Sequence, residues 1–500
     1  MQPAAALPRP ASSLSPNRTR PQPSTKTAAV APTSAAEAPI PAQTTAASVA
    51  LAAPPTRTAL KAAAVSVPAG AAVSQPAPVA ASLQSIGTGL NQLLTNTANW
   101  LAQLPGGPIN NLLEGAVYLV RRTLFPTSVG VVTKPIMVPI YPTDVFKSKN
   151  QKLGIYVTLG SDATPALFEL DTGGPGIYGA YAPNNPNNSD WWGDGVVTTP
   201  TKVQVTYDSG NSYSGYLATS QVSIYSAGGT TPLLSTARAK VGQMNTITNG
   251  TTPLWTPDGL PPGVDTPPID EAFYGDFGLA QQYADNGITN VLAQLVYAHG
   301  VKPGYRIHTD PAANTAWLQI GLTNADLQDP SAYYYPTVID PLAPPNARNP
   351  YSGVRYYSKQ VFQANIKISD SAGVILNSID VGMTADTGAP TTLHNTDLAP
   401  IPLPAQYSGI TEKGYLREGL DFTVTGATTG GTQGQVYRFT TKPPNTVPAN
   451  GVVGVQNNKA GNDVYYLNTG IYLFYVNDVV YGLGNRKGGG VIGLVPKAAT

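Results

Sequence analysis

The chain has 500 residues, and 42% of them are apolar, so it can form a sizeable core in one large or several ordinary domains. Charged residues make up only 11% and the formal net charge is +1, which gives a nucleic-acid partner little electrostatic support. The sequence contains no cysteine, and this excludes disulfides, thiol nucleophiles and cysteine-ligated zinc.

The first part of the chain, residues 1–82, consists mainly of Ala, Pro, Ser and Thr with few large apolar residues. Such a segment cannot bury enough surface to offset the entropy cost of ordering, so we predict a disordered tail. Its basic beginning lacks the apolar stretch of about 7–15 residues that a signal peptide carries. No apolar run reaches the roughly 18–20 residues of a membrane helix, so we expect no integral membrane span.

Residues 83–129 differ from this tail because large apolar residues return. From Leu83 to Leu104 they recur at roughly helical spacing, and the sequence PGGP at 105–108 ends the pattern. A second short helix is predicted over 109–122, where two arginines suit a helix C-terminus. We therefore predict a short helical linker segment that packs on the domain after it.

From about residue 130 onward the pattern is β, and the many Gly, Pro and Tyr residues suit a turn-rich β protein. Strands are predicted over 153–160, 202–210, 215–225 and 360–369, each between Gly, Asn, Ser or Pro turns. One helix is predicted over 289–300, because its apolar residues share a face and Gly300 suits its end.

Two acidic turns repeat the same short sequence. ALFELDTGGPG (166–176) places Asp171 after an apolar strand, and VGMTADTGAP (381–390) does the same for Asp386. One Asp-Thr-Gly arises by chance in roughly one chain of this length in ten, but two copies in the same setting are far rarer. Gly173 and Gly388 allow a tight turn in which backbone N–H groups reach the carboxylates. The alternative is a pair of structural Asx turns.

Two carboxylates a few ångströms apart suit acid–base chemistry. They cannot both ionise easily, so the pair shares one proton. The ionised member acts as a base on a water held between them, while the protonated member polarises a substrate carbonyl. Asp171 and Asp386 are therefore the predicted catalytic residues, and this chemistry needs no metal or organic cofactor.

The region from about 135 to 498 resembles a pepsin-like aspartic protease, which implies a mostly β, bilobal fold with one Asp-Thr-Gly loop per lobe. Further stretches occur in the order of that family. VQVTYDSGNSYSGYLATSQVSI is similar to its flap hairpin, and YGDFGLAQQYADNGITNVLAQL to the strand and helix that follow. AWLQIGL resembles the strand that closes the first lobe, and TGIYLFYVNDVVYGLGNRKGGGVIGLVPKA resembles the C-terminal strands.

The resemblance implies roles for single residues. Tyr207 occupies the position of the flap tyrosine that closes over the substrate, and Gly210 that of a flap glycine. Tyr178 stands where the family usually has a Trp that hydrogen-bonds the flap tyrosine. Thr172 and Thr387 lock the two loops by hydroxyl bonds in such enzymes. Asp276 matches a structural Asp rather than a catalytic one.

The loops depart from the family at the residue after Asp-Thr-Gly, which is usually Ser or Thr. Here it is Gly174 in the first loop and Ala389 in the second. The missing hydroxyl bonds would have favoured the charged carboxylates, so their loss predicts higher basicity and an activity optimum nearer neutral pH.

A closer relationship is suggested by the Asp loops and by LAQLPGGPINNLLEGAVYLVRRTLFP (101–126). These stretches resemble the aspartic protease domains of mycobacterial PE/PGRS surface proteins. The resemblance implies a secreted or cell-envelope enzyme that processes surface or secreted proteins, and we expect a monomer.

Other candidate residues were weighed against this interpretation. None of the histidines (His299, His308 and His394) has metal-ligand spacing, although His394 could tune the dyad from eight residues beyond Asp386. Trp191 and Trp192 lie in a polar loop. They either contact a peptide or glycan at the cleft rim or, as the default, anchor the loop on the core.

The predicted domains are a tail (1–82), a helical linker (83–129), an N-terminal lobe with the first Asp loop and flap (130–325) and a C-terminal lobe with the second (326–500). The predicted function is an aspartic endopeptidase that acts on polypeptides. The alternatives are a catalytically silent pepsin-like surface binding protein and a structural or glycan-binding envelope protein.

Overall fold

The computed structural model describes residues 131–145, 150–207, 209–349, 352–359, 361–395, 411–412, 414–446, 450–457, 466–484 and 489–497. The predicted tail and the predicted helical linker lie outside these residues. In the described part no helix is both long and apolar enough to cross a membrane.

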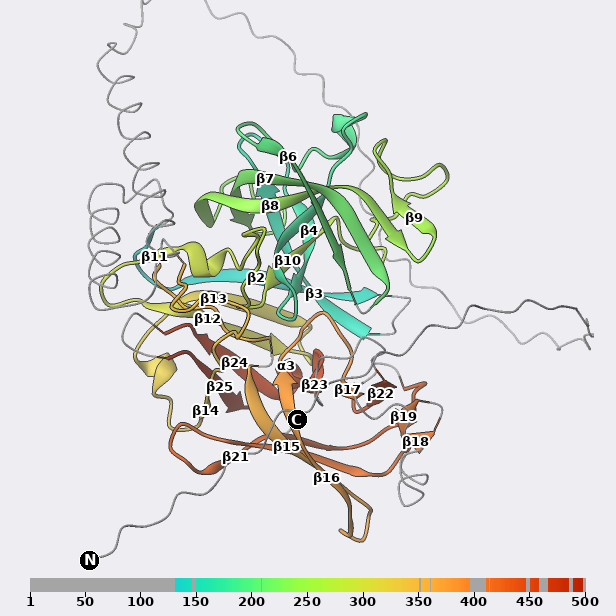
Figure 1. Ribbon diagram of the computed structural model, residues 1–500, viewed down its shortest axis with the longest axis vertical. Helices are drawn as coiled ribbons and strands as arrows, with labels where there is room; N and C mark the ends of the chain where they lie inside the picture. The colour runs from blue at the N-terminus through green and yellow to red at the C-terminus, as the bar shows by residue number, and fades with distance from the viewer. Residues whose placement is uncertain are drawn as a thin grey trace, which may run out of the picture. The chain divides into compact units, whose positions relative to one another are not determined.

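The larger of the two main sheets has fourteen strands, which can be followed in Figure 1. In spatial order they are β14 (Tyr333–Pro336), β25 (Val491–Pro496), β24 (Asn477–Gly482), β12 (Lys302–Asp310), β13 (Thr315–Leu322), β2 (Ile136–Val145), β3 (Asn150–Leu159), β4 (Ala166–Asp171), β10 (Gly275–Leu279), β5 (Pro175–Ala180), β8 (Leu234–Asn249), β7 (Asn211–Tyr225) and β6 (Val197–Thr206), with β9 (Thr252–Trp255) beside β8. This sheet includes strands from both sides of residue 326, and the predicted lobe boundary there stays a prediction.

The second sheet has nine strands and comes entirely from the C-terminal part of the chain. Its order is β18 (Thr411–Glu412), β19 (Tyr415–Leu416), β22 (Gly454–Asn457), β17 (Thr392–Asn395), β23 (Tyr466–Asn468), β16 (Ile375–Thr384), β15 (Phe362–Ser369), β20 (Asp421–Ala427) and β21 (Gln433–Thr440). Helical turns in the described residues are short: α3 (Tyr472–Val476), η1 (Pro186–Asn188), η2 (Leu292–Gln294) and η3 (Ala325–Leu327).

The strand predictions rest on side-chain alternation, and β15 shows it most clearly. Phe362, Ala364, Ile366 and Ile368 are buried, whereas the residues between them are more exposed. This period of two is what a sheet with one buried face requires. The predicted strands over 153–160, 215–225 and 360–369 are confirmed as β3, β7 and β15, and the strand predicted over 202–210 is confirmed as β6 but ends at Thr206.

The helix predicted over 289–300 is wrong. Only the single turn η2 forms there, and the chain then becomes extended as β11 (Val296–Tyr297), which pairs in parallel with β1 (Val131–Val132). Apolar residues on every side of this segment are buried, so it is not an amphipathic helix with one covered face. The tertiary pairing therefore overrides the local helical pattern.

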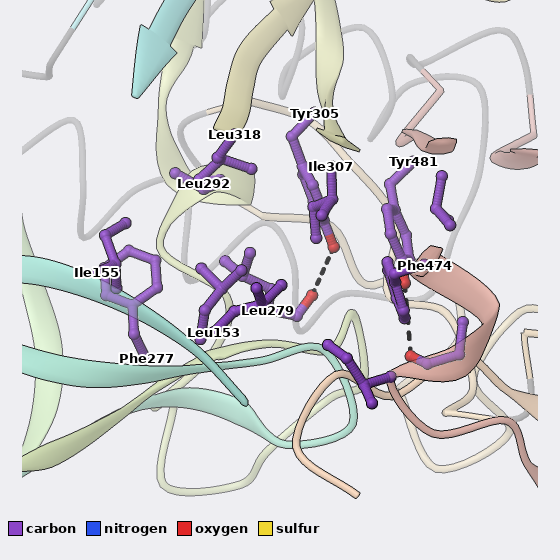
Figure 2. Packing of buried hydrophobic residues seen from close by; sticks show 14 of the residues in the cluster. Leu153, Ile155, Phe277, Leu279, Leu292, Tyr305, Ile307, Leu318, Phe474 and Tyr481 are labelled. Atoms are coloured by element: carbon purple, nitrogen blue, oxygen red, sulfur yellow. Dashed lines mark hydrogen bonds between the residues drawn. The ribbon is translucent and has the colours of Figure 1, made fainter. Parts of the chain in front are cut away.

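The core connects strand β10 to the strands from the C-terminal part of the sheet. The ring of Tyr305 on β12 stacks on Tyr481 of β24, with ring centroids 4.6 Å apart. Its hydroxyl donates a hydrogen bond of 2.8 Å to the backbone oxygen of Leu279. Figure 2 shows Tyr305 directed at Leu279 among the packed apolar side chains. This contact holds the end of β10, the strand that lies beside the first Asp loop.

Candidate active site

The two Asp-Thr-Gly turns lie at the ends of strands in different sheets. Asp171 is the last residue of β4, which pairs with β3 and β10. Asp386 lies just beyond the end of β16, which pairs with β15 and β23. Both carboxylates are nearly buried, with exposed fractions of 7% and 9%. The structure therefore brings together two residues that are 215 positions apart in the chain.

Each carboxylate is held by its own turn. The backbone N–H of Gly173 donates to Asp171 Oδ1 at 2.6 Å, and that of Gly388 donates to Asp386 Oδ1 at 2.7 Å. These are the N–H contacts that the sequence pattern predicted. A carboxylate that accepts backbone N–H bonds is fixed in orientation, because rotation would leave the buried donor without a partner.

The two turns are joined by reciprocal threonine bonds. Thr172 Oγ1 accepts the backbone N–H of Thr387 at 3.0 Å and donates to the backbone oxygen of Ala385 at 2.8 Å. Thr387 Oγ1 accepts the backbone N–H of Thr172 at 3.1 Å and donates to the backbone oxygen of Leu170. Both threonines are buried. The network makes the separation of the two carboxylates a property of the fold.

The glycines of the two turns are required by space. A methyl group on Gly173 would lie 2.4 Å from the Asp386 carboxyl carbon, and one on Gly388 would lie 3.0 Å from Asp171 Oδ1. Neither glycine has a positive φ, so the requirement is close approach rather than an unusual backbone conformation. Each turn thus presses against the carboxylate of the other, and the two carboxylates face each other.

The environments of the two carboxylates differ. Asn468 on β23 donates its side-chain N–H to Asp386 Oδ2 at 2.6 Å, in a buried hydrogen bond. Burial raises the pKa of Asp171 well above its ordinary value, and the negative charges of Asp386, Asp276 and Glu169 raise it further. Asp171 therefore holds a proton more strongly than a solvent-exposed aspartic acid does.

A buried ion-pair network lies behind Asp171. Lys152 Nζ is 2.7 Å from Glu169 Oε1 and 2.7 Å from Asp270 Oδ2. Burial raises the pKa of Glu169 to about 7, against the opposing attraction of Lys152. Burial alone would lower the pKa of Lys152, but the two carboxylates raise it above its ordinary value. The lysine therefore stays charged and is matched by these two acids.

The predicted flap is the hairpin of β6 and β7. Its turn is closed by the backbone N–H of Tyr207, which donates to Asn211 at 2.9 Å, and by Gly210, whose φ of 87° suits glycine. The Tyr207 side chain turns inward, and its hydroxyl donates to Asp276 Oδ2. Burial, followed by the charge of Asp276, raises the pKa of Tyr207, which keeps the hydroxyl protonated.

Tyr178 does not have the role that the resemblance implied. The Tyr207 hydroxyl bonds to Asp276 and not to Tyr178, whose own side chain interacts with Asn286. Burial raises the pKa of Tyr178 to about 12, and the residue does not line the cavity between the Asp loops. The expected tyrosine–tyrosine bond is wrong because the Asp276 carboxyl group, on the residue that pairs directly with Tyr178 across β10 and β5, accepts the Tyr207 hydroxyl instead.

Asp276 is the residue whose importance the sequence pattern concealed. It was expected to be structural, and it lines a cavity of about 360 Å³ together with Asp171 and Asp386. A methyl group on Gly174 would lie 2.5 Å from Asp171 Oδ2 and 3.3 Å from Asp276 Oδ2, so any side chain at residue 174 would crowd both carboxyl groups. The first Asp loop therefore has no hydroxyl at residue 174, and the Asp276 carboxyl group lies close to that position.

The remaining candidates fall into two groups. His394 is buried, lines the cavity and stacks on Tyr466 with ring centroids 4.2 Å apart. His299 is exposed in a turn, and His308 lies 2.7 Å from Asp478 outside the cavity. No group of three or more His, Cys, Asp or Glu residues in the described part of the chain has the arrangement of a metal site.

Trp191 and Trp192 anchor their loop, as the default interpretation predicted. Both indole N–H groups donate to the backbone oxygen of Ala180, at 3.0 Å and 2.8 Å. Trp191 also packs 4.4 Å from the ring of Tyr274, between ring centroids. Neither tryptophan lines the cavity.

The chain is similar to the crystal structure of the aspartic proteinase from Irpex lacteus, with 17% identity and a TM-score of 0.43. The similarity covers 73% of this chain and 98% of that one. No family model and no curated protein matches the sequence. The topology itself confirms the predicted fold class, mostly β with one Asp-Thr-Gly loop in each of two halves.

Proposed function

We propose that the chain is an aspartic endopeptidase that uses a water held between Asp171 and Asp386. The observation that carries the proposal is the pair of facing, nearly buried carboxylates, fixed by reciprocal threonine bonds beside a cavity. Two structural Asx turns would need neither the contact between the turns nor the cavity.

The different surroundings of the two acids assign their roles. Asp386, which accepts the Asn468 N–H, acts as the base and takes a proton from the attacking water. Asp171, whose pKa burial and neighbouring charges raise, donates its proton to the peptide carbonyl oxygen as the water oxygen bonds to the carbonyl carbon. The C–N bond then breaks as the nitrogen takes the proton from Asp386, and the new carboxyl group returns a proton to Asp171.

The substrate and location belong to the same proposal. The likeness of the two Asp loops to mycobacterial PE/PGRS protease domains supports a secreted or envelope-bound enzyme that processes surface proteins. It rests on the sequence of those loops and of residues 101–126. The flap side chain Tyr207 lies over the cavity and would exclude water from a bound polypeptide.

The test compares the full-length chain with Asp171→Asn and Asp386→Asn variants on denatured casein and on a peptide library. Each substitution keeps size and removes one ionisable group, so we expect activity to fall by about a thousandfold or more. Asp380→Asn on the exposed part of β16 is the matched control and should keep full activity. Pepstatin should inhibit the wild type.

Two results would count against the enzyme. Proteolysis that survives all three treatments would show that other residues carry it. A folded wild type that binds polypeptides but cleaves none at any pH would favour the silent binding protein.

A further inference from the structure

The wall of the cavity on the Asp171 side carries two more carboxyl groups. Glu169 on β4 and Asp276 on β10 are direct partners in the parallel pairing of these strands, and both line the cavity. Their exposed fractions are 7% and 2%. Carboxylates buried to this extent are normally paired with a cation or fully hydrogen-bonded.

Glu169 has such a cation and Asp276 does not. Lys152 lies 2.7 Å from Glu169 and 2.7 Å from Asp270, so its charge is already matched. Asp276 Oδ2 accepts the Tyr207 hydroxyl, but Oδ1 has no hydrogen-bond partner. No ion pair within the described ranges includes Asp276. One oxygen of this cavity-lining acid is thus buried without a donor.

The surfaces around Asp276 suit a long side chain with a charged tip. The rings of Tyr207 and Tyr213 lie 5.0 Å apart between centroids, and Val205 lines the same part of the cavity. Such surfaces cover the methylene stem of a lysine or arginine, and aromatic faces also attract its charge.

The opposite wall has the reverse character. Lys359 Nζ lies 5.3 Å from the centroid of the Tyr466 ring, and the ring of His394 stacks on the same tyrosine. All three residues line the cavity. Because Lys359 repels a second cation, a positively charged substrate side chain has a favourable place only on the Asp171 side.

We propose that this wall is a subsite for the lysine or arginine side chain of a polypeptide substrate, with the Asp276 carboxyl group as its partner and Glu169 as a second acid behind it. The inference rests on the proposed function and deepens it. A single point, the methyl position of Gly174, is 2.5 Å from Asp171 Oδ2 and 3.3 Å from Asp276 Oδ2. The bound side chain therefore belongs to a residue next to the cleaved bond.

Binding of the cation is coupled to a proton. Burial raises the pKa of Asp276 well above its ordinary value, and the charge of Glu169 raises it further. An arriving ammonium or guanidinium group favours the carboxylate, so it lowers this pKa and releases the proton from molecules in which Asp276 carries one. The groups that face Asp276 from neighbouring elements are Lys152 of β3, Glu169 and Asp171 of β4, Tyr178 of β5, Tyr207 of the flap turn, Tyr213 of β7 and Asp386 beyond β16.

The first experiment measures cleavage by the full-length chain. Pairs of peptides differ only by lysine or norleucine, placed first on one side and then on the other side of the cleaved bond. We expect kcat/KM to favour lysine by about tenfold or more at one of these places, since a buried charged hydrogen bond has about that value. Asp276→Asn, which keeps an acceptor for Tyr207, should remove most of this preference, whereas Asp380→Asn should not change it. Equal rates for every pair in the wild type would overturn the subsite.

The second experiment separates the subsite from the protease. Uncleavable peptides with a reduced bond are titrated calorimetrically in two buffers of different ionisation enthalpy. The lysine peptide should release up to about one proton on binding, and the norleucine peptide and Asp276→Asn should show no such release. A wild type that cleaves nothing but shows this release would refute the protease and keep the subsite.

Cleavage of the lysine and norleucine peptides at equal rates would support the protease and refute the subsite. If Asp276→Asn does not fold, Glu169→Gln provides the second variant and should reduce the lysine preference by a smaller factor. The calorimetric titration of the wild type in two buffers still tests the subsite, because binding of the lysine peptide without proton release overturns the proposal.

Discussion

The two Asp loops are alike in their own residues and unlike in the residues beside them. In each half, the residue two positions before the Asp pairs in parallel with a residue of the neighbouring strand. In the first half this pair is Glu169 with Asp276, and in the second it is Thr384 with Asn468. The same frame therefore holds two acids on one side and two neutral side chains on the other.

This difference separates the residues that determine the geometry of the two Asp loops from those that determine the charge around the two carboxylates. The threonines and glycines of the loops are matched, and they make matched contacts across the interface of the two turns. The strand-paired residues beside the loops differ between the two halves, so the two carboxylates have different electrostatic surroundings. Changes in the loops should therefore affect both halves equally, and changes behind them should affect each half differently.

Apart from loss of the two aspartates themselves, the largest effect is expected from Gly173→Ala and Gly388→Ala. Each new methyl group would overlap the carboxylate region of the other half, so the pair must move apart. Because a misplacement of about 1 Å can cost about a hundredfold in rate, we expect kcat to fall by that factor or more in both variants. Gly489→Ala is the control, since nothing lies within 4 Å of its methyl position. A large loss in one loop variant with none in the other would break the symmetry of the frame.

The second effect is on stability. Thr172→Val and Thr387→Val each leave a buried N–H and a buried backbone oxygen without a partner. We expect each to lower the free energy of unfolding by about 2–4 kcal/mol, measured by urea denaturation. Thr158→Val is the control, because the Thr158 hydroxyl is buried with no partner and its removal should be neutral or stabilising. The two loop variants should also be non-additive, since they belong to one network.

The sequence predicted the frame well and the charge difference poorly. A local motif, Asp-Thr-Gly, was sufficient to identify Asp171, Asp386 and the threonine bonds, because each motif residue acts within its own turn or in the identical turn opposite. Asp276 lies beside Glu169 because β10 pairs in parallel with β4. Pairing between strands more than 100 residues apart leaves no local signal in the sequence. Alternation along β4 could have indicated Glu169, since it shares a face with Asp171.

The same limit explains the two errors. The segment 289–300 has helical spacing, but its pairing with β1 and its burial on all sides come from distant residues. The expected bond between Tyr178 and Tyr207 failed because the Tyr207 hydroxyl bonds to the Asp276 carboxyl group instead. In both cases the local pattern was present, and a tertiary contact of larger free energy decided the outcome.

The third prediction makes the second half resemble the first. Asn468→Asp replaces the N–H that Asp386 accepts by an acid at the same place. Two like charges would then compete for ionisation beside the base, so the acidic limb of the pH–rate profile should move to higher pH. We expect kcat/KM to fall by about tenfold at mildly acidic pH, with partial recovery as the pH rises. An unchanged profile would mean that Asn468 only holds the backbone of Gly470, to which it also bonds.

The smallest effect comes from making the first half resemble the second. Asp171 has a raised pKa because of burial first, then Asp386, and then Asp276 and Glu169. Asp276→Asn removes one of these negative charges, so the pKa of Asp171 should fall. In the proposed mechanism the pair holds one proton and loses activity when Asp171 gives it up, so a lower pKa of Asp171 would move the basic limb of kcat/KM to lower pH. We expect a shift of about half a pH unit to one unit, equivalent to about 1 kcal/mol. Asp380→Asn should leave the limb in place, and an upward shift would mean that Asp276 acts on the dyad by hydrogen bonding rather than by its charge.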